Sequence, residues 1–408
     1  MQALVSLDQA PPISVPLRFF LTAPLFTVLA ALVMLATGPE LWASRWTPAA
    51  LAVTHLITAG FMLQTMLGAL QQLMPVVMGV QMARPRLVAG AVHTSLTLGV
   101  LCLAGGFLSA SGPGYALAAG LLGLGVLVFV VASIHAMWGL PPAAPVATGL
   151  RLALAALLLA AGLGVWMTLA LAGLHTMALP LKQMANVHLG WGLIGWSSTL
   201  LGAIALVVVP MFQMTPGYPA WFGRWFGWAA LFFVSLWSAA EWQHWALTST
   251  WLGAAVVSMG LCLAGTTLWV LRRSRRAVRD AVARLWQVAM LSAVAACVVW
   301  LVGSLLPELA DAGAWPLLVG VLALLGGFLS VMTGMLYKIV PFLIWMHLQE
   351  QGAGRVMAPN IKKVLAQHAI DQQTRSHWAS LVLLLLAACW PQWFSYPGAL
   401  ALLVSQIW

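Results

Sequence analysis

The sequence predicts an all-α polytopic membrane protein with about 12 transmembrane helices in a pseudo-threefold arrangement. Of the 408 residues, 62% are hydrophobic and only 6% are charged, far below the roughly 25% that is typical of soluble domains. Apolar runs of about 18 residues or more recur along the chain, and each is long enough to cross a bilayer. These observations exclude an ordinary soluble protein and predict a single integral membrane domain over residues 1–408.

The spans follow from the apolar runs and from the polar segments between them. The predicted spans cover residues 16–37, 49–79, 87–109, 115–137, 149–174, 185–210, 223–247, 250–271, 282–306, 316–347, 377–391 and 394–408. A polar segment over 348–376 predicts a cytoplasmic loop with a short surface helix at Ala358–His368. The four cysteines stand alone in separate apolar runs, which predicts buried thiols rather than disulfides.

Basic residues gather in alternate connections, and this asymmetry predicts the orientation. One set contains Arg18, Arg84, Arg86, Arg151, Arg224, Arg272, Arg273, Arg275, Arg276, Arg279, Arg284, Arg355, Lys362, Lys363 and Arg375. The opposite set contains only Arg45 and Lys182 as basic residues, beside Glu40, Glu308 and Asp311. The positive-inside rule then predicts cytoplasmic termini in a bacterial-type inner membrane. The net charge of +10 predicts contact with membrane lipids, and no basic soluble domain is present to bind nucleic acid.

Three spans share a repeated pattern that ends in proline. Thr54–Pro75, Val187–Pro210 and Val319–Pro341 each contain a glycine seven or eight residues before that proline, at Gly68, Gly202 and Gly334. The first two copies also begin with a histidine, His55 and His188. Three copies predict the pseudo-threefold arrangement, with any chemistry on helices two, six and ten.

The faces of these helices suggest a cofactor. An α-helical period of 100° places Met62 and Met66 close to His55 on helix two. On helix six, His188 shares a face with Gly192, Gly195 and other small residues. Such faces could hold a flat macrocycle against the backbone, and the alternative is that the small residues only allow close helix packing.

At these residues the chain resembles subunit I of the haem-copper oxidase superfamily. The number and orientation of the spans are similar over the whole chain. His55, followed by Gly68 and Pro75, is similar to the second helix of that family, whose histidine ligates a low-spin haem. The resemblance implies a cytochrome c oxidase subunit I-like fold, a b-type haem and an electron donor from the respiratory chain.

The chain also departs from that family. Helix ten has no histidine between Trp315 and Trp345, whereas the family has two there, one for each haem. We therefore expect His55 and His188 as the axial haem ligands and not a normal oxygen-reducing centre. A second metal, copper or iron, could bind at His188, Glu241 and His244, because an E-x-x-H spacing places two ligands on one helical face. The alternatives are a solvated acid at Glu241 and an interfacial His244.

Lys338 is unusual because it lies beside Tyr337 on the glycine face of helix ten. A lysine facing the interior of a membrane domain indicates a proton or anion path, and the alternative is that it extends to the lipid headgroups. We interpret four histidines as structural or interfacial and place His368 and His377 in or beside the cytoplasmic loop. The four are His93, His135, His175 and His347.

The sequence thus favours a haem protein that transfers electrons or that senses or handles a diatomic gas, and it assigns no catalytic residue. A cofactor-free transporter or permease is the competing class, since many carriers have twelve spans with embedded glycine and proline. The threefold recurrence argues against the two repeated halves of a carrier. An accessory subunit of a respiratory complex is the third possibility.

Overall fold

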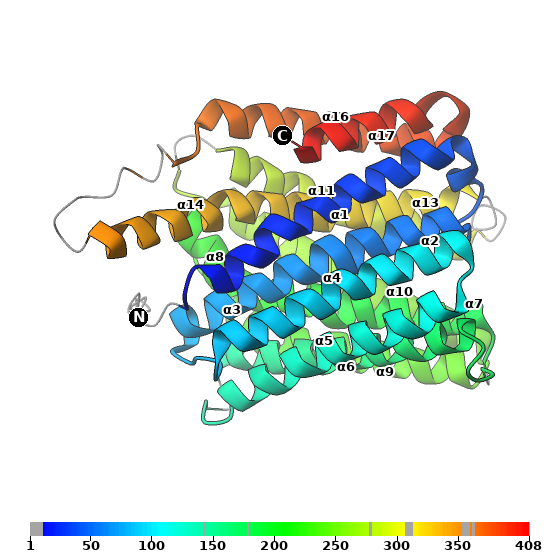
Figure 1. Cartoon of the computed structure of the whole chain (residues 1–408), viewed down its shortest axis with the longest axis horizontal. Coiled ribbons are helices and arrows are strands. Elements are labelled where there is room, and N and C mark those ends of the chain that lie inside the picture. Colours follow the sequence, from blue (N-terminus) through cyan, green and yellow to red (C-terminus); the bar gives the residue numbers. More distant parts are fainter. Residues whose placement is uncertain are drawn as a thin grey trace. The chain divides into compact units, whose positions relative to one another are not determined.

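Helices form the secondary structure throughout the residues that the computed structural model describes, which are 11–141, 144–177, 179–276, 280–306, 313–352, 360 and 364–407 (Figure 1). Within these residues, nine helices are long and apolar enough to cross a membrane. Three more, α9, α16 and α17, complete twelve helical rods in the described part of the chain. The protein is therefore an all-α polytopic membrane protein, as predicted.

The chain divides into two compact units. Unit 1 comprises Met1–His93, Val278–Ser292 and Gly313–Trp408. It contains α1 (Ser14–Thr37), η2 (Gly38–Ala43), α2 (Pro48–His55), η3 (Leu56–Leu63), α3 (Gln64–Met78), α13 (Ala314–Gly320), η5 (Val321–Leu329), α14 (Ser330–Gly352), α16 (Gln367–Cys389) and α17 (Pro391–Ile407). The first parts of α4 (Pro85–Ser109) and α11 (Ala281–Leu305) also belong to it.

Unit 2 comprises Thr94–Ala277 and Ala293–Ala312. It contains α5 (Gly112–Ala136), α6 (Pro145–Leu171), α7 (Leu181–Gly190), η4 (Trp191–Ser198), α8 (Thr199–Gln213), α9 (Ala220–Trp242) and α10 (Ala246–Arg272), with the remaining parts of α4 and α11. The second and tenth predicted spans therefore lie in unit 1, and the sixth lies in unit 2.

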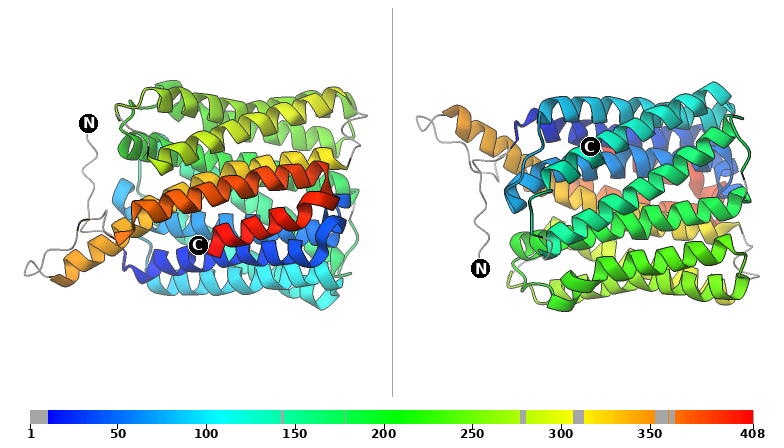
Figure 2. Two further views of the ribbon diagram at one scale, coloured as in Figure 1. Left: turned by 90° about the horizontal axis from the view of Figure 1, so that it is seen from above. Right: turned by 90° about the horizontal axis from the view of Figure 1, so that it is seen from below.

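Each unit is held together by close contacts between its own helices. In unit 1, α17 packs against both α16 and α1 (Figure 2), and α1 packs against η3 and α3. A Cβ added at Gly60 would lie 2.5 Å from the Phe26 ring, so only glycine lets α1 approach this closely. In unit 2, α6 packs against α5, η4, α8 and α9, and Gly149 allows a similarly close approach to Ala203.

Helix ends follow local sequence signals. Thr47 and Ser111 cap α2 and α5, since their hydroxyl oxygens accept hydrogen bonds from the backbone N–H groups of Ala50 and Gly114. The helix α3 ends at Met78 and is followed by Gly79, whose φ of 67° is left-handed and favours glycine. Most predicted spans agree with the observed helices to within five residues. The largest difference is in α16, which begins at Gln367 and not at residue 377.

Some predictions fall partly outside the described residues. The structure extends α14 to Gly352 and begins α16 at Gln367, so the predicted loop 348–376 is shorter at both ends. Residues 358–359 and 361–363 of the predicted helix Ala358–His368 lie outside the described residues, as do Glu308, Asp311, Arg279 and Arg355.

Candidate functional site

The second span changes helical form directly after its histidine. His55 is the last residue of α2, and the next eight residues form the π-helix η3 before α3 resumes at Gln64. The half-buried His55 ring bonds through Nδ1 to the carbonyl oxygen of Leu51, 2.8 Å away. A carbonyl can only accept, so Nδ1 carries the proton and the neutral ring has its lone pair on Nε2.

The sixth span has the same construction in unit 2. His188 lies in α7, three residues before the π-helix η4. Its Nδ1 donates to the carbonyl oxygen of Ala160 on α6, at 2.9 Å. The ring packs against α6 at Gly164, where an added Cβ would lie 3.0 Å from the ring carbon Cε1. His188 therefore also carries its lone pair on Nε2, with the ring orientation set by a neighbouring helix.

The tenth span contains the third π-helix, η5, and lacks a histidine at this depth. The three π-helices end at the same point of the repeat. A buried polar residue, Gln64, Thr199 or Ser330, follows each of them, eleven positions before Pro75, Pro210 or Pro341. The exposed fractions of these three side chains are 0%, 1% and 0%. The three repeated spans therefore share local backbone structure as well as sequence. π-Helices are rare and often mark functional sites.

The π-helices change which residues share a face. A π turn closes between residues i and i+5, so the period of 100° that placed Met62 and Met66 on the face of His55 does not apply across η3. Met62 lies within η3 and Met66 lies in the first turns of α3. Both are buried, with exposed fractions of 2% and 7%, and the structure describes them as core residues of unit 1.

Side chains fill most of the space beside the repeated glycines. An added Cβ would lie 2.8 Å from Phe19 at Gly68 and 2.8 Å from Phe226 at Gly202. At Gly334 it would lie 3.3 Å from Leu285. These three glycines therefore serve close helix packing. Gly192, four positions after His188, differs because no heavy atom lies within 4 Å of its added Cβ.

The proposed ligands of a second metal do not share a helical face. Helix α9 ends at Trp242, and His244 follows in a turn with a left-handed φ of 58°. Its Nδ1 accepts a hydrogen bond from the Gln183 amide, at 3.1 Å. Glu241 accepts a hydrogen bond from Ser249 on α10. Among the described residues no group of three histidine, cysteine or acidic side chains could hold a metal ion, so His188, Glu241 and His244 do not form such a site.

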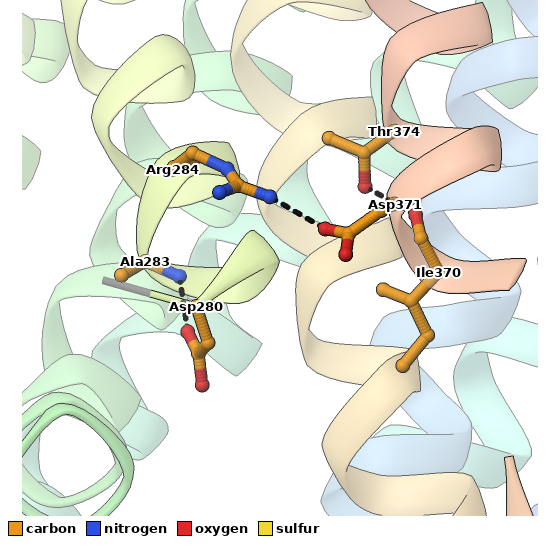
Figure 3. A network of polar contacts seen from close by, with 6 residues as sticks. All are labelled: Asp280, Ala283, Arg284, Ile370, Asp371 and Thr374. Carbon is orange, nitrogen blue, oxygen red and sulfur yellow. Dashed lines mark hydrogen bonds and ion pairs between the residues drawn. The ribbon is translucent and has the colours of Figure 1, made fainter. Parts of the chain in front are cut away.

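Lys338 is paired rather than solitary. Its Nζ lies 2.9 Å from Asp280 Oδ2, and the two side chains are 27% and 19% exposed. Asp280 also accepts from the backbone N–H of Ala283 in the first turn of α11 (Figure 3). Tyr337 donates to Gln373 Oε1 on α16, at 2.6 Å. The two residues predicted for a proton path thus contact different helices of unit 1.

A second ion pair joins α11 to α16. Arg284 Nη2 lies 2.5 Å from Asp371 Oδ1, and one turn later Thr374 donates to the carbonyl oxygen of Ile370 (Figure 3). These contacts help to explain how the polar first half of α16 is accommodated, because Asp371 has a partner on α11 and Gln373 has one on α14.

The sequence placed His377 in or beside the cytoplasmic loop, and this placement is wrong. His377 is the eleventh residue of the 23-residue helix α16 and is 0% exposed. Its ring lies 2.7 Å from the Ser330 hydroxyl. The helical spacing of Ile370, Gln373, Thr374, His377 and Leu381, all buried, could have revealed this helix. Mean hydropathy conceals it because the buried positions are mostly polar.

Comparison with known proteins does not add to these findings. No protein-family model matches the chain, and a search of the curated proteins finds no match. The structure identifies the chain as an all-α polytopic membrane protein.

Proposed function

We propose that the protein is an oxidase-subunit-I-like membrane protein that binds a b-type haem, for which His55 of unit 1 and His188 of unit 2 are the candidate ligands. The observation that carries this proposal is the shared tautomer of the two rings. In both, Nδ1 donates to a backbone carbonyl oxygen, which is the arrangement that histidine ligands of metals usually have. Nε2, the atom that would bind iron, therefore carries the lone pair in each case.

The helical context supports the proposal. Each histidine precedes a π-helix at a similar position of the repeat, and an otherwise apolar span offers little reason for an imidazole. Gly192 leaves open space four positions after His188, where a macrocycle edge would fit. The pseudo-threefold arrangement of the three repeated helices belongs to the same proposal.

A bound haem would supply one-electron exchange or the binding of a diatomic gas. The chain's own contribution would be to hold the two rings in one tautomer through Leu51 and Ala160. In this proposal a respiratory-chain donor delivers electrons, and the protein lies in a bacterial-type inner membrane. The second metal is not part of the proposal, since its predicted ligands do not assemble.

The absorption spectrum of the purified chain tests this proposal. We expect reduced-minus-oxidised bands of a low-spin b-type haem in the natural protein, and their loss in both His55→Ala and His188→Ala. His93→Ala is the matched control, because the His93 ring is already bonded to the Thr22 hydroxyl at 2.9 Å. Its spectrum should be unchanged.

Circular dichroism and gel filtration would show that each variant is folded. A natural protein without haem, or a folded His55→Ala or His188→Ala variant with unchanged bands, would contradict the proposal.

A cofactor-free carrier is the second candidate. The close packing of Phe19 on Gly68 and of Phe226 on Gly202 favours it, because these glycines leave no room for a macrocycle at their depth. A spectrum without haem bands, together with solute flux into vesicles that contain the protein, would support this alternative.

A further inference from the structure

A buried polar interface joins α14 and α16 within unit 1. Two hydrogen bonds cross it, from Tyr337 to Gln373 at 2.6 Å and between Ser330 and His377 at 2.7 Å. Ser330, Gln373 and His377 are 0%, 6% and 0% exposed. Polar groups inside a membrane domain are costly, and they commonly mark paths for ions or protons.

The hydrogen bonds of Ser330 determine the state of the His377 ring. We assign the Ser330 proton to the bond with the carbonyl oxygen of Leu325, at 3.2 Å, because the opposite assignment would leave a buried N–H at His377 Nδ1 without a partner. The hydroxyl can therefore only accept from His377, so Nε2 of His377 carries a proton. Nδ1 then carries the lone pair of the neutral ring. This atom is buried and has no hydrogen-bond partner within the described part of the chain.

An imidazole nitrogen in this condition is a proton acceptor. Protonation would form an N–H bond at Nδ1 and an imidazolium ring, while the bond from Nε2 to Ser330 would remain. The neutral state leaves a buried acceptor unsatisfied, which destabilises it, and the charged state has lost its hydration. Burial without a counter-charge favours the neutral ring, and the unsatisfied acceptor at Nδ1 opposes that preference. We therefore expect His377 to gain a proton only as the pH becomes acidic, and to release it readily.

Carboxylates lie at the aqueous end of the same interface. Asp371 is six positions before His377 on α16, about 9 Å along the helix axis, and it pairs with Arg284. Asp280 pairs with Lys338, the neighbour of Tyr337. Both ion pairs are partly exposed. The carboxylates of these two ion pairs can exchange protons with water, and each pair includes a residue that lies close in sequence to Tyr337 or Gln373.

We propose that His377 is a proton-binding site, loaded at Nδ1 from water on the side where α11 and α16 begin. The proton comes from hydronium, passes the carboxylates at the ends of these helices and is released again as hydronium or to a further acceptor. The proposal does not require haem, since none of its residues is a proposed haem ligand.

Other titratable groups surround the site. Those on α16 itself are His368, Asp371, Arg375 and Cys389. Helices α17 and η2, which pack against α16, contribute Tyr396 and Glu40. Those on α11 and α14 are Asp280, Arg284, Tyr337 and Lys338. The two acid–base pairs are each neutral overall, so a charge on His377 would not be opposed by a net positive neighbour among these two pairs.

Nitrogen NMR of the full chain in lipid bilayers, with ¹⁵N-labelled histidine, tests the proposal. As the pH falls from 8 to 3, the ring of His377 should convert from a neutral form with the proton on Nε2 to an imidazolium. His377→Asn should remove that signal, and His93→Gln should leave it in place. Ser330→Ala should shift its Nε2 resonance, which assigns the signal even if His377→Asn does not fold.

The route is tested by the rate of proton exchange at Nδ1, which Asp371→Asn should slow several-fold. Lys182→Gln, a change at an exposed residue of unit 2, is the control and should not alter the rate. A His377 ring that stays neutral throughout this pH range would overturn the protonation site. An exchange rate that Asp371→Asn leaves unchanged would overturn the route.

Discussion

At the scale of single residues, charges in unit 1 are accommodated by pairing across helices. Lys338 on α14 pairs with Asp280 at the start of α11, and Arg284 on α11 pairs with Asp371 on α16. The sequence alone left Lys338 either facing the interior or extending to the headgroups. The structure gives it a partner at hydrogen-bond distance, so a partly buried amine does not have to bear the full desolvation penalty alone.

The Lys338–Asp280 pair gives a stability prediction. Asp280→Asn or Lys338→Met should each lower the free energy of unfolding by about 1–2 kcal/mol, because one partly buried charge loses its partner. The double variant should recover part of this loss. Unfolding in mixed micelles, followed by circular dichroism, measures the effect. Additive losses in the double variant would show that the two groups are not energetically coupled.

At the scale of elements, each of the three π-helices must return to α-helical form at its end, where the backbone hydrogen-bond pattern changes. In two of them, a hydroxyl donates to the carbonyl oxygen five residues earlier, from Thr199 to Ile194 and from Ser330 to Leu325. The backbone N–H of Thr199 meanwhile bonds to Trp196, three residues back. The hydroxyl thus satisfies a carbonyl at the junction of the two helical forms.

Thr199→Val tests this role of the hydroxyl. The substitution keeps the shape of the side chain and removes the donor, so we expect a loss of about 1–3 kcal/mol in the free energy of unfolding. Thr168→Val is the matched control, because Thr168 donates to the carbonyl oxygen of Gly164 within the regular helix α6. The Gly164 carbonyl lies in a regular helix, where backbone N–H groups also bond to the carbonyl oxygens. Thr168→Val should therefore lose less free energy of unfolding than Thr199→Val. Equal losses in the two variants would contradict the role of Thr199.

At the scale of the whole molecule, basic residues are concentrated at alternate ends of the successive helices. Arg272 ends α10, and Arg18 lies in the first turns of α1. The positive-inside rule places these ends in the cytoplasm. On this basis we propose cytoplasmic termini, and the orientation in turn sets the outer depth that we propose for His55 and His188.

Cysteine labelling tests the orientation. A cysteine introduced at Arg275, in a variant without the natural cysteines, should not react with a membrane-impermeant maleimide in intact cells, and it should react after the cells are opened. A cysteine introduced at Arg45 should react in intact cells. Labelling at position 275 from outside would reverse the proposed topology and the direction of proton loading at His377.

The sequence by itself determined the class of this protein and most of its helices. An apolar run long enough to cross a bilayer must satisfy its backbone hydrogen bonds internally, so its composition and length already require a helix. The sequence also shows the three repeated spans, because Gly68, Gly202 and Gly334 recur at a similar distance before a proline.

Only the tertiary structure decided what the polar residues do. The π-helices change the faces that an α-helical period predicts, the helix end at Trp242 separates Glu241 from His244, and the start of α16 at Gln367 places His377 in the interior. The physical reason is shared by all three. A polar group is stable inside a membrane domain only through partners from other turns or helices, and such partners are distant in sequence, as Ser330 is from His377.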